Sequence, residues 1–170
     1  DTRRAGYRDA GLTTAEQPES DSFEWGVAFT ASLAFHLQHT GFTVDVVETG
    51  YRQLTTPEHQ DEFLESLAAV ELVDGPQLTR LLAGGSDPGQ SLGSVFAVMA
   101  DAETHTIEQL ATQRAQFDSA LAFVVNPHNE VVIGPLRDAG WTCVAVRPTD
   151  DLAAVWLAAA KTRAANRARS

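Results

Sequence analysis

Apolar and polar positions along the chain predict strands that alternate with helices. Residues 43–48 (TVDVVE) predict the first strand. Three later runs are apolar throughout rather than alternating, and they cover residues 94–100 (SVFAVMA), 120–126 (ALAFVVN) and 141–147 (WTCVAVR). Such strands are typical of a parallel sheet that helices cover on both faces. The pattern therefore predicts an α/β domain with a doubly wound, three-layer, Rossmann-like sheet that is mainly parallel.

Five segments with helical character lie between or after these strands. They span approximately residues 22–41, 56–70 and 104–117, a stretch that ends at Ala139, and a last helix that follows Asp150. Ser22 or Asp21 is expected to cap the first helix and Asp150 the last. Gly134-Pro135 is expected to start or interrupt the fourth.

The first 21 residues differ from the rest of the chain because they are polar and aperiodic. We expect an N-terminal arm or loop over residues 1–21 and a single α/β domain over residues 22–170. A length of 170 residues fits one domain of ordinary size. The chain does not begin with Met, and we expect it to be a fragment of a longer protein.

The segment 22–41 (SFEWGVAFTASLAFHLQHTG) is apolar nearly all the way round. At about 100° per residue, one broad arc of this helix carries most of its apolar side chains. Gly26 falls in that arc, where a missing side chain allows close backbone approach. Trp25 and Phe35 fall on or near the opposite, polar arc. Because large exposed rings are typical of interfaces, we predict that Trp25 and Phe35 bind a partner. Candidates are the N-terminal arm, another part of a parent protein, or a second copy.

Charge and composition narrow the classes of partner. The net charge is −11, which argues against a nucleic-acid surface and against attraction to anionic lipid. No run is apolar enough for a membrane span, and the first residues do not resemble a signal peptide. Cys143 is the only cysteine, which suits a reducing cytoplasm. Its apolar surroundings in the sequence predict a buried, inert thiol rather than a nucleophile.

The sequence lacks the familiar motifs of catalysis. It contains no GxGxxG after a strand, no GxxxxGK[ST], no GxSxG and no HExxH. His36 and His39 share a helical spacing, but a solvated or capping role is favoured over a metal site because no third ligand is evident. We therefore expect a protein that is not an enzyme, and no cofactor.

Two aspartates are the candidates for a metal site. Asp101 follows the strand 94–100 directly, and ligands of open α/β sheets bind at the carboxyl ends of strands. Asp1 would lie at the same edge if a strand preceded it. Mg²⁺ prefers oxygen ligands of this kind. The simpler interpretation, in which Asp101 only begins the next helix, is favoured.

Three segments resemble a known family: DTRR at the start, SFEWGVAFTASLAFHLQHTGFTVDVV with a DEFLESLAAVEL helix after it, and the tail AGWTCVAVRPTDDLAAVW. They are similar to the C-terminal part of actinobacterial members of domain-of-unknown-function family fifty-eight. That resemblance implies a von Willebrand factor type A-like fold, with a strand before Asp1 and a metal-ion-dependent site at the carboxyl edge of the sheet. It also implies a MoxR-type AAA ATPase as a neighbour, and in full-length members N-terminal membrane helices.

The metal motif of that family, Asp-x-Ser-x-Ser, corresponds here to Asp1-Thr2-Arg3-Arg4-Ala5. The aspartate is kept, both serines are lost, and an arginine brings positive charge where a cation would sit. Asp101 corresponds to the later aspartate of the site. We therefore predict that this domain does not need metal.

These observations favour a non-enzymatic protein-interaction domain that binds a protein partner, with a MoxR-type ATPase as the candidate. The alternative is a Mg²⁺-dependent ligand-binding module that uses Asp1 and Asp101; a hydrolase or nucleotide enzyme is a third class that rests on fold analogy. If no strand lies before Asp1, the open sheet would favour pairing between copies. The expected location is the cytoplasm, or the soluble part of a membrane-anchored parent.

Overall fold

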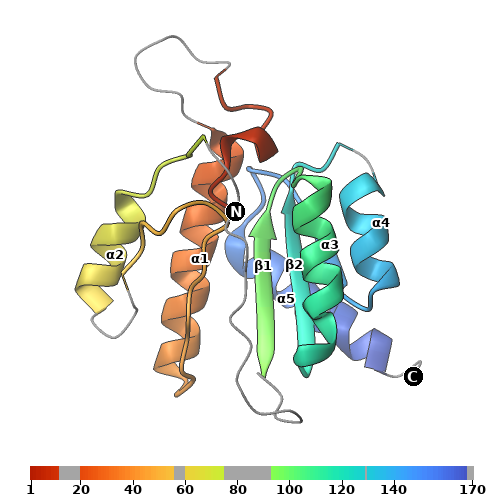
Figure 1. Cartoon of the computed structure of the whole chain (residues 1–170). Coiled ribbons are helices and arrows are strands. Elements are labelled where there is room, and N and C mark those ends of the chain that lie inside the picture. Colours follow the sequence, from red (N-terminus) through yellow and green to blue (C-terminus); the bar gives the residue numbers. More distant parts are fainter. Residues whose placement is uncertain (12–19, 56–59, 75–92, 129, 168–170) are drawn as a thin grey trace.

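The computed structural model describes residues 1–11, 20–55, 60–74, 93–128 and 130–167. Within them lies a sheet of three parallel strands, in the order β1 (Ser94–Met99), β2 (Ser119–Val125) and β3 (Thr142–Val146) (Figure 1). All three strands predicted from continuous apolar runs are confirmed. Their parallel pairing is also confirmed, with Val95 opposite Ala120 and Ala122 opposite Cys143.

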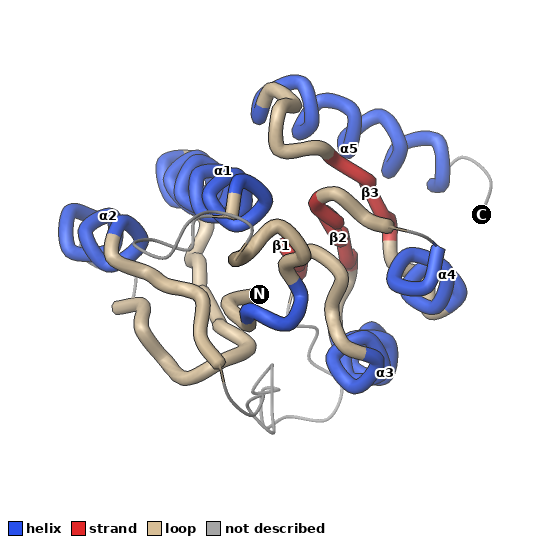
Figure 2. The backbone as a smooth tube through the Cα atoms, turned by 90° about the horizontal axis from the view of Figure 1, so that it is seen from above, coloured by secondary structure: helices blue, strands red, loops and turns tan. Residues whose placement is uncertain are grey.

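Helices cover both faces of this sheet. The α-helices are α1 (Asp21–His39), α2 (Gln60–Ala68), α3 (Thr104–Gln113), α4 (Glu130–Asp138) and α5 (Leu152–Arg167), and the short 3-10 helices are η1 (Arg4–Gly6) and η2 (Arg114–Gln116). Viewed from above, α1 and α5 lie on one face of the sheet and α3 and α4 on the other (Figure 2). The expected α/β architecture, with helices on both faces of a parallel sheet, is therefore confirmed. Among the described helices, none has both the length and the apolar character needed to cross a bilayer.

The core consists of a layer of apolar side chains on each face of β2, a strand that is buried along its whole length. Towards α3 and α4 the layer contains Ala122, Val124 and Leu136. Towards α1 and α5 it contains Phe29, Phe123 and Val155. Side chains alternate between the faces of a strand, so a strand covered on both sides must be apolar at every position. This explains why β2 does not show a polar alternation.

Two helix caps differ from those expected. Ser20, not Ser22 or Asp21, caps α1, and its hydroxyl accepts a hydrogen bond from Phe23 N at 3.1 Å. Asp151 caps α5 by accepting from Ala154 N at 2.9 Å, whereas the Asp150 carboxylate accepts from Arg147 N in the turn before it. A capping side chain lies three residues before the free N–H that it satisfies. The cap moves with the start of the helix: α1 begins earlier than expected, at Asp21, and α5 begins later, at Leu152.

The predicted strand over residues 43–48 is wrong. The segment runs back alongside α1, and exposed and more buried side chains alternate along it, as they would in a strand (Figure 1). Its inward-facing side chains, Val44 and Val46, pack against the cluster of Ala34, Leu54, Phe63 and Leu67. However, it has no hydrogen-bonded neighbour among the described residues, and a strand is defined by its ladder. The start of the expected helix 56–70 lies outside the described residues.

The helix α1 is apolar nearly all the way round because it packs against other elements on two sides. One side packs on the sheet through Trp25, Phe29 and Leu33. The other side packs on α2 and on segment 43–48 through Ala34 and its neighbours. At Gly26 the helix faces β1, and a Cβ there would lie 3.4 Å from Val98 Cγ1, at the start of ordinary van der Waals contact. The close backbone approach expected of Gly26 therefore stays a prediction.

Candidate functional site

Residues 1–11 pack over the carboxyl end of β1 rather than extending as a free arm. The amino group of Asp1 donates to Val98 O at 2.6 Å, and Asp101 N donates to Gly6 O at 2.9 Å. A Cβ on Gly6 would lie 3.2 Å from the Asp1 Oδ2 and 3.6 Å from the Asp101 carbonyl oxygen. The structure thus places both metal-site candidates at one edge of the sheet. The rest of the expected arm, residues 12–19, lies outside the described residues.

Each of these two carboxylates is held by groups of the chain itself. Asp1 Oδ1 accepts from the Thr49 hydroxyl and from Arg3 N. Asp101 Oδ2 pairs with Arg8 Nε at 2.6 Å, and its Oδ1 accepts from His128 N at 3.3 Å. A cation between the two carboxylates would have to compete with the Arg8 guanidinium.

Arg3, the arginine expected to bring positive charge to the metal position, contacts a carboxylate elsewhere. Arg3 is buried and forms an ion pair with Glu103, at the start of α3. Within the described part of the chain, no group of three or more His, Cys, Asp or Glu side chains could hold a metal ion.

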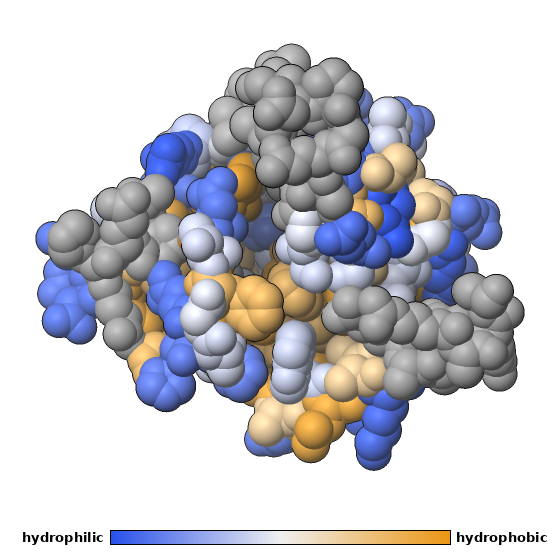
Figure 3. All heavy atoms as spheres, turned by 90° about the horizontal axis from the view of Figure 1, so that it is seen from below, coloured by the Kyte–Doolittle hydropathy of each residue, from blue (hydrophilic) through white to orange (hydrophobic). Residues whose placement is uncertain are grey.

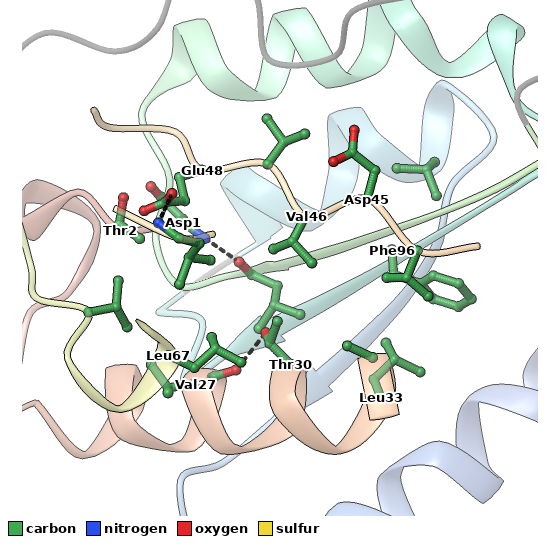
Figure 4. A pocket seen from close by; sticks show the side chains of 18 of the residues that line it. Asp1, Thr2, Val27, Thr30, Leu33, Asp45, Val46, Glu48, Leu67 and Phe96 are labelled. Carbon is green, nitrogen blue, oxygen red and sulfur yellow. Dashed lines mark hydrogen bonds between the residues drawn. The ribbon is translucent and has the colours of Figure 1, made fainter. Parts of the chain in front are cut away.

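A groove of about 400 Å³ lies between α1, segment 43–48 and β1. Its apolar lining includes Val27, Leu33, Val46, Leu67 and Phe96. Figure 4 shows Thr30 on the α1 side of this groove, while Asp1, Thr2 and Glu48 gather at one end. Seen from below, apolar side chains surround a hollow near the middle of the face (Figure 3). The groove is thus largely apolar along its length and polar at the Asp1 end.

Glu48 is the most unusual side chain of the groove. It is only 5% exposed, and its Oε2 accepts from Gln53 N and Leu54 N, both at 2.9 Å. Its Oε1 is buried without a hydrogen-bond partner among the described residues. An unpaired buried carboxylate oxygen is costly, so this atom favours a donor that enters the groove.

The charge of Glu48 also acts on the neighbouring amino group. Burial lowers the pKa of the Asp1 amino group to about 6, and the negative charge of Glu48 partly opposes that decrease. The polar end of the groove therefore contains two carboxylates, those of Asp1 and Glu48.

The two aromatic residues predicted to bind a partner lie in different environments. Trp25 is only 6% exposed, its ring stacks on Phe29, and its Nε1 donates to Asp150 O at 2.8 Å. The prediction that Trp25 faces a partner is therefore wrong in this structure, because its ring covers the turn before α5. Phe35 is 47% exposed and stacks on His39, so its partner role stays a prediction.

The remaining candidates have local roles. His36 lies edge-on to Trp156, and His39 stacks on Phe35, so the structure gives each ring an aromatic neighbour. Cys143 is partly buried on β3, where burial raises the pKa of its thiol to about 11. A thiol of that kind is a poor nucleophile near neutral pH.

Neither Glu48 nor Thr30 was predicted from the sequence as a groove residue. Glu48 is the last residue of segment 43–48. A carboxylate at the end of a predicted strand was the signal in the sequence that could have indicated a site residue. Its burial depends on Gln53 and Leu54, whose backbone donors fold back onto it.

No family model, no curated protein and no solved structure matches this chain.

Proposed function

We propose that this chain is a non-enzymatic protein-interaction domain and that the groove between α1, segment 43–48 and β1 is its binding site. The observation that carries the proposal is a groove with apolar walls on a chain whose other apolar layers are filled. Binding sites in proteins are typically concave and mostly apolar, with a few polar groups that fix orientation, as Glu48 and Thr30 would here.

A von Willebrand factor type A-like identity is part of this proposal. It is supported by the parallel sheet with helices on both faces and by the meeting of Asp1 and Asp101 at its carboxyl edge. The resemblance in sequence makes a MoxR-type AAA ATPase the first partner to test.

The interaction function is tested by a matched pair of substitutions on α1. Thr30 lines the groove and Ser32 is exposed, and each hydroxyl donates to the carbonyl four residues earlier. Thr30→Trp would fill the groove, whereas Ser32→Trp would add the same ring to the helix surface. We expect proteins of the source cell, the MoxR-type ATPase among them, to bind the wild type and Ser32→Trp but not Thr30→Trp. Identical sets of bound proteins for all three would contradict the proposed site.

A Mg²⁺-dependent ligand-binding module is the second candidate, because Asp1 and Asp101 do meet at one edge of the sheet. Arg8 at Asp101 opposes it, since a guanidinium already neutralises that carboxylate. We expect millimolar Mg²⁺ or Mn²⁺ to produce no heat of binding and no change in melting temperature. A saturable signal that Asp101→Asn removes would favour the metal-dependent module instead.

A further inference from the structure

We infer that the groove binds an extended segment of another protein, which adds to the sheet as a strand parallel to β1 and carries a lysine or arginine at the Glu48 end. This inference rests on the proposed interaction function and specifies the chemistry of the partner. It is argued from the two walls of the groove and from the charges that line it.

The first wall is the outer edge of β1, which lies at the end of the strand order and has no strand beside it among the described residues. Gly93 O accepts from Asp118 N and Ser119 N, so the backbone of residue 93 faces β2. Backbone polar groups of an extended chain alternate in direction, and residues 95, 97 and 99 therefore also face β2. Ser94, Phe96 and Val98 then direct their N–H and C=O groups into the groove.

One hydrogen bond on this edge is already made. The amino group of Asp1 donates to Val98 O at 2.6 Å. A backbone thus fits beside β1 at the separation of a ladder, and no described residue bonds to the groove-facing backbone groups of Ser94 and Phe96, where a strand could be added.

The second wall is segment 43–48. No backbone N–H or C=O in this segment has a hydrogen-bond partner among the described residues, although its side chains alternate as in a strand. It runs in the same direction as β1 (Figure 1). Two extended backbones therefore flank one groove, and the sides that face it have, apart from Val98 O, no hydrogen-bond partner among the described residues. A small apolar ligand would leave both sets of backbone groups unpaired, whereas a peptide strand can bond to them.

The occupant must be apolar towards α1 and basic at one end. The α1 side presents Val27, Leu33 and Leu37. The acidic side chains among the described lining residues are Asp1, Asp45 and Glu48, and none of these described residues is a Lys, Arg or His. The buried Oε1 of Glu48 has no donor within the described part of the chain. Charge complementarity thus selects a segment with a lysine or arginine, and the net charge of −11 disfavours a second copy of this chain as its source.

The test uses an acetylated and amidated octapeptide of alternating valine and threonine with lysine as its seventh residue. Two matched peptides replace that lysine by glutamate or methylate alternate backbone nitrogens. We expect the lysine peptide to bind the wild-type domain at least about tenfold more tightly than either matched peptide, as measured by calorimetric titration. The methylated peptide keeps its side chains, so its loss of affinity reports the backbone ladder alone.

Variants of the domain separate the two parts of the inference. Thr30→Trp should weaken binding of the lysine peptide at least about tenfold, whereas Ser32→Trp should leave it unchanged. Glu48→Gln retains an oxygen that can accept from Gln53 and Leu54, and it should remove the preference for lysine over glutamate. Circular dichroism and thermal unfolding establish that each variant is folded, and Glu48→Gln tests the charge without filling the groove.

Several results would overturn the inference: no binding of the lysine peptide at millimolar concentration, equal binding of the methylated peptide, or a wild-type dimer that Thr30→Trp dissolves. If the peptides fail but partner proteins still distinguish Thr30→Trp from Ser32→Trp, the strand mode is wrong and the interaction function stands. If partner proteins also bind Thr30→Trp and Ser32→Trp equally, the proposed function is wrong as well.

Discussion

At the scale of single residues, burial decides which side chains can take part in chemistry. Tyr7 is buried beside Phe23 and donates to Asp1 O at 2.6 Å, and burial raises the pKa of its phenol. Asp1 and Asp101 are occupied by Thr49 and Arg8. Among the described residues that line the groove, Glu48 combines deep burial with a carboxylate oxygen that has no hydrogen-bond partner.

The thiol of Cys143 should be slow to react. Burial raises its pKa to about 11, so little thiolate forms at pH 8. We expect its reaction with a disulfide reagent at pH 8 to accelerate many-fold when the protein is unfolded in urea. Equal rates in the folded and unfolded protein would contradict the burial of this side chain.

The ionised carboxylate of Asp9 should stabilise the folded protein at pH values above its ordinary pKa. Burial alone would raise the pKa of its carboxyl, but hydrogen bonds from Ser20 and Ser22 lower it on balance. Because the folded pKa lies below the unfolded value of about 3.9, this contribution is complete above that value and is lost as the pH falls through the folded pKa. Asp9→Asn should flatten the dependence of unfolding free energy on pH in that acid range. An unchanged acid limb in denaturant titrations would show that these hydrogen bonds do not form.

At the scale of elements, sequence periodicity predicted the three paired strands because a fully covered strand must be apolar throughout. It failed at 43–48 because a strand also requires a neighbour, and pairing is a property of the fold rather than of a segment. It placed Trp25 on or near the polar arc of α1, whereas the structure buries this ring with Phe29 against the sheet and the turn before α5. The edge position of Asp101 was predictable, since it follows a strand directly.

The cap of α1 offers a test at this scale. Ser20 is buried and its hydroxyl satisfies Phe23 N, so Ser20→Ala should lower the free energy of unfolding by about 1 kcal/mol. The exposed Ser32 on the same helix donates only to Ala28 O, and Ser32→Ala should change it by less than about 0.5 kcal/mol. Denaturant titration compares the two. Equal effects would mean that Ser20 does not cap the helix.

Packing on β2 offers a second comparison. Phe123 is fully buried between α1 and α5, and Phe123→Ala should cost about 3–5 kcal/mol of unfolding free energy. Phe35 is half-exposed, and Phe35→Ala should cost less than about 1 kcal/mol. If thermal or chemical unfolding ranks the two in the opposite order, the core has been placed on the wrong side of α1.

At the scale of the whole molecule, the groove joins an edge of the sheet to an extended segment. Covering helices fill both faces of β2, whereas β1 and β3, among the described residues, each have a neighbour on one edge only, and across the groove from β1 segment 43–48 has none. Unpaired edges favour addition of another strand. The apolar groove and the open edge are therefore one feature, and they form the site on which the proposed function depends.

Amide hydrogen exchange along β1, resolved residue by residue by NMR, measures whether the groove edge of this strand is unpaired. We expect alternation in the free domain: Val95, Ala97 and Met99 face β2 and exchange slowly, whereas Phe96 and Val98 face the groove and exchange faster. The lysine peptide should then slow exchange at Phe96. Uniformly slow exchange from Val95 to Met99 in the free domain would show that the groove edge of β1 is already paired, and addition of a further strand there would be ruled out.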